Sequence, residues 1–125
     1  MTEDLTDADF SPSYWAKMGK DLIDKDYSRL HTVEDICSIL GISSGHFRDV
    51  FRMAYGVNPK FYLLCVKVEK AMELLKDESV MVCDVAKKVG IPQRNVFKKT
   101  FKRIVGTTPS QYRKTPSSVE IDPRK

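Results

Sequence analysis

The stretch VCDVAKKVGIPQRNVFKKTFKRIVGTTPSQY, residues 82–112, decides the fold of this chain. It predicts a short helix over 82–89 that ends at Gly90, because glycine commonly terminates helices. A second helix follows from Pro92 to Gly106, and Phe97 and Phe101 lie one helical turn apart on its inner face. Two short helices joined by a glycine-containing turn form a helix-turn-helix unit.

The same pattern occurs a second time, about 50 residues earlier in the chain. Residues of matching type recur 49 positions apart, as Val33, Asp35, Ile36, Cys37, Leu40 and Gly41, and then as Val82, Asp84, Val85, Ala86, Val89 and Gly90. After one inserted residue the spacing becomes 50, with Phe47, Phe51, Gly56, Pro59 and Tyr62 matching Phe97, Phe101, Gly106, Pro109 and Tyr112. The chain therefore contains two copies of one unit.

Each copy meets the requirements of a helix-turn-helix. A small residue is needed where the helices cross, a glycine in the turn, and an apolar residue that closes the core. These residues are Cys37 and Ala86, Gly41 and Gly90, and Phe47 and Phe97. The second helix of each copy also keeps an exposed polar face, as a helix that enters a major groove must.

The rest of the chain predicts further helices and no strands, which makes the fold class all-α. A helix over 14–27 has apolar residues at helical spacing, with Trp15 and Tyr14 expected in the core. Asn58 and Pro59 begin a long helix that runs to about Lys76 and connects the two units. Helix starts are marked by Thr32 with Asp35 in a capping-box arrangement, by Ser43 or Ser44, and by Thr108 with Pro109.

Composition and cysteine spacing exclude several classes of protein. The chain has 125 residues, 42% of them hydrophobic and 30% charged, as expected of one globular domain. No apolar run approaches the roughly 18 residues that span a bilayer. The three cysteines are Cys37, Cys65 and Cys83. Because no pair has CxxC spacing, they predict reduced core residues rather than a metal site.

The charge is unevenly distributed along the chain. The net charge is +4, yet residues 1–27 contain seven acidic residues against three lysines. Residues 85–119 contain nine basic residues and no acidic one: Lys87, Lys88, Arg94, Lys98, Lys99, Lys102, Arg103, Arg113 and Lys114. This asymmetry indicates a polyanion as the partner of the C-terminal half.

From Trp15 to Arg113 the chain resembles the AraC/XylS family of transcription regulators. The most specific part is Gly90-Ile91, Phe97–Arg103, Gly106–Pro109 and Tyr112-Arg113, which is similar to a family signature ending in G-x-[ST]-P-x-x-[YF]-R. The first copy also matches, through Ile42-Ser43, Phe47, Phe51-Arg52 and Gly56, as does Ala71–Leu75 in the connecting helix. The chain departs from the family pattern at Ile91, Lys67 and Asp49, where Phe, Arg and a basic or polar residue are usual.

The resemblance implies a seven-helix domain in which two helix-turn-helix subdomains are joined by a long connecting helix. We expect a flexible acidic arm over 1–12, the DNA-binding domain over 13–114, and a flexible tail over 115–125. Within the domain, the predicted parts are a first unit over about 30–57, the connecting helix over about 58–76, and a second unit over about 80–106. Family members commonly carry an effector or dimerisation domain, and none fits in 125 residues. The chain is therefore either a stand-alone regulator or a domain of a longer one.

The implied partner is double-stranded DNA, read in two successive major grooves. The residues expected to contact bases are Ser44, Gly45, Arg48, Asp49, Arg94, Asn95, Lys98 and Lys99. Arginine and lysine pair with guanine, asparagine pairs with adenine, and a carboxylate accepts from the amino group of cytosine. The alternative for the second helix is a solvated basic face, and for Arg48 a plain surface charge.

A second set of residues is expected to contact phosphates, which fixes the register of the protein on DNA without reading sequence. These are Thr32, Ser43, Arg52, Lys102 and Arg103. Thr32 lies at a helix N-terminus, where a backbone N–H can hold a phosphate. A simple helix cap is the alternative role for Thr32.

The sequence predicts no enzyme, cofactor, metal site or membrane association, because no catalytic constellation or metal spacing is present. The expected location is the cytoplasm, at the nucleoid. An alternative function is a protein-interaction module that docks on the transcription machinery, such as RNA polymerase, and binds DNA only weakly. Asp49 and the acidic N-terminal half motivate that alternative.

Overall fold

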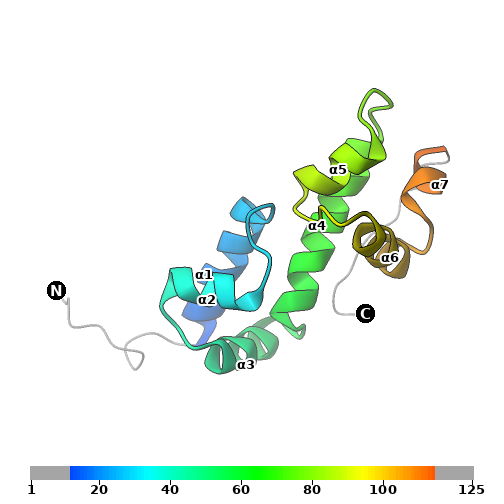
Figure 1. Ribbon diagram of the computed structural model, residues 1–125. Helices are drawn as coiled ribbons and strands as arrows, with labels where there is room; N and C mark the ends of the chain where they lie inside the picture. Colours follow the sequence, from blue (N-terminus) through cyan, green and yellow to red (C-terminus); the bar gives the residue numbers. More distant parts are fainter. Residues whose placement is uncertain (1–11, 115–125) are drawn as a thin grey trace.

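The computed structural model describes residues 12–114, which form seven helices and no strand (Figure 1). The helices are α1 (Pro12–Asp26), α2 (Val33–Leu40), α3 (Ser44–Tyr55), α4 (Pro59–Leu75), α5 (Val82–Lys88), α6 (Arg94–Val105) and α7 (Pro109–Lys114). The predicted all-α, seven-helix fold is confirmed. The predicted arm and tail lie almost entirely outside the described residues.

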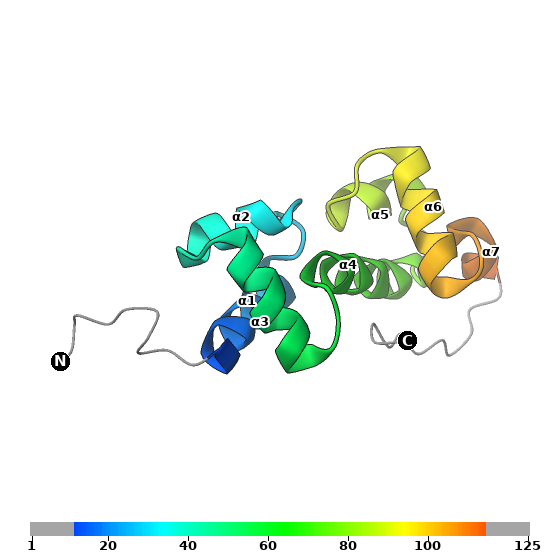
Figure 2. The same cartoon turned by 90° about the horizontal axis from the view of Figure 1, so that it is seen from below.

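Two helical units sit at opposite ends of α4 (Figures 1 and 2). The first contains α1, α2 and α3, and its core is centred on Phe47, Phe51 and Ile36. The second contains α5, α6 and α7, and its core is centred on Phe97 and Phe101. Residues of α4 enter both cores, while Tyr27 packs against each of them from the side. The fold is thus two small cores threaded by one helix.

The sequence repeat is visible as repeated geometry. Helices α3 and α6 each have 12 residues and each end at a glycine in the left-handed conformation, Gly56 and Gly106. The turns are also equivalent, since the Ile42 N–H donates to the Cys37 carbonyl and the Ile91 N–H to the Ala86 carbonyl. Glycine suits the positions of Gly56 and Gly106 because a positive φ strains any residue with a Cβ.

The predicted starts of α2, α3 and α4 are confirmed, whereas α1 begins at Pro12, two residues before the predicted start at Tyr14. Thr32 and Asp35 form a reciprocal capping box at α2, Ser43 rather than Ser44 caps α3, and the Asn58 side chain caps α4. The prediction for α6 was early, since this helix begins at Arg94 and not at Pro92. Gln93 is still extended, because the turn of the second unit uses the one extra residue to bring the chain out of the core.

The inner face of α1 differs from the predicted one. Ala16 and Ile23 are buried and Trp15 is half-buried, whereas Tyr14 is 38% exposed instead of lying in the core. The reason is Gly19, where a Cβ would lie 2.3 Å from two ring carbons of Phe47. The glycine lets the Phe47 ring rest on the α1 backbone, and this rotates Tyr14 towards solvent.

Arg113 holds the last helix to the rest of the second unit. Its guanidinium donates to the carbonyl oxygens of Leu75 (2.9 Å), Asp77 (3.3 Å) and Val80. These carbonyls lie at the end of α4 and in the loop that follows, where helix geometry leaves acceptors unsatisfied. Arg113 is therefore a structural residue, although it is one of the nine basic residues found in 85–119.

Two of the three cysteines have the predicted core character, and Cys83 lies outside both cores. Cys37 and Cys65 are buried, Cys83 is half-buried, and all three are free thiols. Burial raises the pKa of the Cys65 thiol to about 11. Across residues 12–114, no cluster of His, Cys, Asp and Glu side chains could hold a metal ion. Over the same span, no helix has the length and apolarity needed to cross a membrane.

Candidate nucleic-acid interface

Helix α6 presents an uncompensated basic face. Phe97 and Phe101 are buried on its inner side, which turns the remaining side chains outward. The exposed residues include Arg94, Asn95, Lys98, Lys99 and Lys102. Within residues 12–114, none of the ion pairs involves a side chain of α6. The face is therefore a strip of free cations and one amide, which matches the groups that read guanine and adenine.

Helix α3 occupies the equivalent place in the first unit but has a different charge balance. The Arg48 guanidinium lies 3.0 Å from the Glu34 carboxylate on α2, and Arg52 lies 3.8 Å from Asp49. Both arginines of this helix are thus paired with acids. Since the α6 cations have no such partners, the two recognition helices differ in the charge that they offer to a polyanion.

The small residues at the start of α3 leave room in front of the helix. Gly45 is exposed, and a Cβ added there would have no neighbouring atom within 4 Å. Ser44 is half-buried and Asp49 is exposed. The structure therefore brings Ser44, Gly45, Arg48 and Asp49 onto one stretch of helix, as the sequence predicted, with an open position at Gly45.

The residues expected at phosphates have mixed surroundings. The Thr32 N–H donates to the Asp35 carboxylate at 3.1 Å, and the Thr32 hydroxyl accepts from the Asp35 N–H. Hydrogen bonds from the His31 and Thr32 backbone lower the pKa of Asp35 and keep it anionic. The structure thus shows Thr32 as a helix cap beside a carboxylate, an arrangement that opposes a phosphate contact.

The other four phosphate candidates remain accessible. Arg52, Lys102 and Arg103 are exposed, and Ser43 is exposed although its hydroxyl accepts from the His46 N–H as a cap. The Arg103 guanidinium also lies 5.6 Å from the centre of the Phe61 ring on α4. This cation–π contact orients Arg103 without neutralising its charge.

Two residues at the interface were not predicted. Glu34 was missed because its partner Arg48 is 14 residues away and only the packing of α2 on α3 brings them together. Val96 is 49% exposed at the start of α6, and a single valine among basic residues carries no signal of exposure in the sequence. An exposed valine beside Asn95 offers an apolar surface of the kind that contacts the methyl group of thymine.

Replacing Glu34 with glutamine is expected to raise the affinity for duplex DNA by about two- to fivefold, because an exposed ion pair is worth up to about 1 kcal/mol. The variant frees Arg48 and removes a negative charge beside α3. Fluorescence anisotropy with a labelled duplex measures the change.

Glu78→Gln is the control for this variant, since it removes an exposed acid in the loop after α4, away from α3. We expect this control to bind like the unaltered protein. A loss of affinity in Glu34→Gln would contradict the expectation and would show that Glu34 holds Arg48 in place instead of competing for it.

Comparisons with known proteins agree with this geometry. A family model described as "Helix-turn-helix domain" matches residues 36–115. The lactose operon transcription activator of Staphylococcus xylosus is 30% identical over 93 residues, which cover 74% of this chain. The chain spans only 33% of the length of that relative.

Solved structures show the same fold. The C-terminal domain of AraT, a response regulator from Geobacillus stearothermophilus, superposes with a TM-score of 0.78 and 26% identity, over 85% of this chain and 88% of that one. The DNA-binding domain of AdpA, solved in complex with a target DNA, gives a TM-score of 0.70 and 24% identity, over 80% and 89% of the two chains. The second of these likenesses concerns the fold alone.

Proposed function

Since the chain belongs to the AraC-type family of helix-turn-helix transcription regulators, we propose that it reads two successive major grooves of duplex DNA with α3 and α6. The two grooves lie about 34 Å apart on one face of B-DNA. In this proposal α6 is the principal reader, through Arg94, Asn95, Lys98 and Lys99. Helix α3 is the secondary reader, through Ser44, Gly45, Arg48 and Asp49.

One observation carries the proposal: the exposed cations of α6 have no acidic partner within residues 12–114. Where acidic side chains pair with the basic ones of a surface, part of the positive charge is already neutralised. Exposed cations without acidic partners keep their full charge, which favours binding of a polyanion. Membership of a family of helix-turn-helix transcription regulators supports duplex DNA as that polyanion.

Phosphate contacts are assigned to exposed groups beside the two readers. Lys102 and Arg103 lie on α6, Arg52 on α3, and Ser43 at the start of α3. Thr32 is left out of this set, because its N–H is engaged by Asp35. Such contacts fix the position of each recognition helix in its groove.

The test is a selection of randomised duplex DNA by this protein at about 150 mM salt, a concentration at which purely electrostatic binding is weak. We expect a bipartite motif whose halves are about one helical turn apart. A single half-site would restrict base reading to α6, with α3 only positioning the protein.

A parallel selection with a matched variant gives the control. In Arg94→Ala/Lys98→Ala the half-site read by α6 should disappear while the protein stays folded by circular dichroism. Failure of the unaltered protein to enrich any sequence would refute sequence-specific reading by these helices and favour docking on a protein partner.

A further inference from the structure

Besides the residues of α4 and Tyr27, a close approach of two backbones brings the units together. Gly90, in the turn of the second unit, lies against Ser28, in the loop after α1 of the first unit. A Cβ built on Gly90 would stand 2.4 Å from the Ser28 carbonyl oxygen and 3.1 Å from its carbonyl carbon. Only a residue without a side chain permits this approach, so the backbones of the two units are in direct contact.

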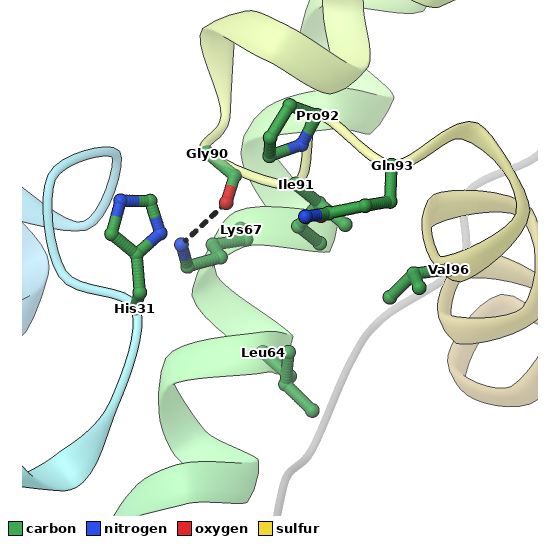
Figure 3. Close-up of a pocket in the computed structure, with 8 residues that line it drawn as sticks. All are labelled: His31, Leu64, Lys67, Gly90, Ile91, Pro92, Gln93 and Val96. Atoms are coloured by element: carbon green, nitrogen blue, oxygen red, sulfur yellow. Dashed lines mark hydrogen bonds between the residues drawn. The ribbon is translucent and has the colours of Figure 1, made fainter.

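A buried lysine lies beneath that contact. Lys67, near the middle of α4, is 2% exposed, and its ammonium donates to the Gly90 carbonyl at 3.1 Å (Figure 3). A Cβ on Gly90 would stand 2.8 Å from the Lys67 Nζ. Burial lowers the pKa of the Lys67 ammonium to about 8, while the Asp35 carboxylate acts in the opposite direction.

The junction beside this contact is open. A cavity of about 440 Å³ lies next to Lys67, with His31 of the first unit on one side and Pro92, Gln93 and Val96 of the second unit on the other (Figure 3). Side chains of the two units therefore do not interdigitate there. The Lys67 hydrogen bond therefore ties the turn of the second unit to the middle of α4, at the place where the Gly90 backbone packs on Ser28 of the first unit.

We propose that Lys67 is a positioning residue that sets the spacing of the DNA site by fixing the two reading units relative to each other. The inference rests on the proposed function, since it requires that both units read DNA at once. Without the Lys67 hydrogen bond, only the packing of Gly90 on Ser28 and of Tyr27 on both cores would add to α4 in holding the units, and a small rotation at this joint would move α6 relative to α3. The base preference of each half-site should be unaffected, because Lys67 donates to a backbone carbonyl in the turn before α6 and to no side chain that is assigned to base reading.

The experiment uses the selected bipartite site and two variants of it, with one base pair added or removed between the halves. The unaltered protein should lose affinity roughly tenfold on each altered site, because one base pair shifts a half-site by about 3.4 Å and a tenth of a turn. In Lys67→Met this penalty should fall to about threefold or less, with unchanged base preference within each half. Lys67→Arg should restore the penalty, since a guanidinium can donate to the same carbonyl.

Lys70→Met is the matched control. Lys70 lies on the same helix and pairs with Glu73 at 3.9 Å, away from Gly90, so its removal should leave the spacing penalty at its original size. Should Lys67→Met not fold by circular dichroism, Lys67→Gln keeps a donor on a shorter side chain and should show an intermediate penalty.

The two ways in which the experiment can fail are distinguishable. If the unaltered protein is indifferent to spacing, simultaneous reading by both units is refuted, and the inference falls with it. If the unaltered protein is sensitive to spacing and Lys67→Met or Lys67→Gln is equally sensitive, the inference alone is overturned, and α4 sets the spacing with the packing of Gly90 and Tyr27.

Discussion

Replacing Arg94 and Lys98 together with alanine is expected to weaken binding to the selected DNA by about 100-fold or more, since each good base contact is worth roughly 1–3 kcal/mol. Both side chains are exposed on α6, and among residues 12–114 neither has an acidic partner, so their full charge is available to DNA and is lost in the variant. The variant should also lose discrimination between the selected site and a scrambled duplex. Fluorescence anisotropy with both duplexes measures the two effects.

Salt dependence separates base reading from general attraction in the same experiment. If six to eight phosphates are neutralised, log K of the unaltered protein should fall with log salt at a slope of about −5 to −7. Loss of one phosphate contact reduces the slope by about one. Because Arg94 and Lys98 are assigned to bases, the slope of the variant should change by less than that for each residue replaced. A binding constant of the unaltered protein that ignores salt would contradict the phosphate contacts.

Two control variants remove the same number of charges. Lys87→Ala/Lys88→Ala acts on exposed residues of α5 and should weaken binding by about threefold or less, as expected for long-range attraction alone. Arg48→Ala/Arg52→Ala acts on α3, where both arginines already have acidic partners, and should cost about tenfold or less. Equal losses in all three double variants would mean that α6 provides charge and no base reading.

Replacing Gly90 with alanine is expected to lower the free energy of unfolding by about 3 kcal/mol or more, because overpacking at a rigid contact adds to backbone strain. Gly90 has a φ of +87°, and its added Cβ would overlap a backbone oxygen and the buried Lys67 Nζ. The oxygen belongs to the Ser28 main chain, so it cannot move as a flexible side chain can. Urea denaturation followed by circular dichroism measures the loss.

Gly41→Ala provides a matched control for this prediction. Gly41 is the equivalent turn residue of the first unit and has a φ of +79°, yet an added Cβ would meet no atom within 4 Å. Only the strain of the left-handed backbone remains, about 1 kcal/mol. Similar losses in the two variants would show that the contact between Gly90 and Ser28 does not resist displacement.

Much of the fold could be predicted because the decisive information is local and repeated. Glycines at the turn positions, prolines at helix starts and the capping residues each act within a few positions along the chain. The repeat provides a second observation of each feature within the helix-turn-helix units, although not of α1, which has no second copy. The start of α6 was misplaced by two residues because proline at 92 is compatible both with a helix start and with an extended turn.

Features that depend on packing could not be predicted in the same way. Apolar spacing alone placed Tyr14 in the core, but the close approach of Phe47 to Gly19 turns α1 and exposes Tyr14. Lys67 and the Gly90 carbonyl that accepts its hydrogen bond are 23 residues apart in the sequence. Nothing in that spacing indicated that Lys67 would be buried. The pairing of Arg48 with Glu34 likewise requires two helices to be in contact.

The base-contact candidates were predicted as positions rather than as interactions. The helical pattern placed Arg94, Asn95, Lys98 and Lys99 on the outer face of α6, and the structure puts them there. Whether these cations are paired with acidic side chains could not be predicted, because the sequence does not say which acidic residues pack against which basic residues. The free cations of α6 and the paired arginines of α3 became distinguishable only in three dimensions.

The open position at Gly45 has a consequence for how such a regulator can change over generations. Most replacements of Gly45 would stabilise the helix by up to about 1 kcal/mol, and the new side chain would enter open space on the face that is proposed to read DNA. Because the two units fold around separate cores, such a change leaves the second unit as it is. If α3 reads bases as proposed, a gene that encodes this chain can acquire a new operator preference in one mutational step, with no compensating substitution.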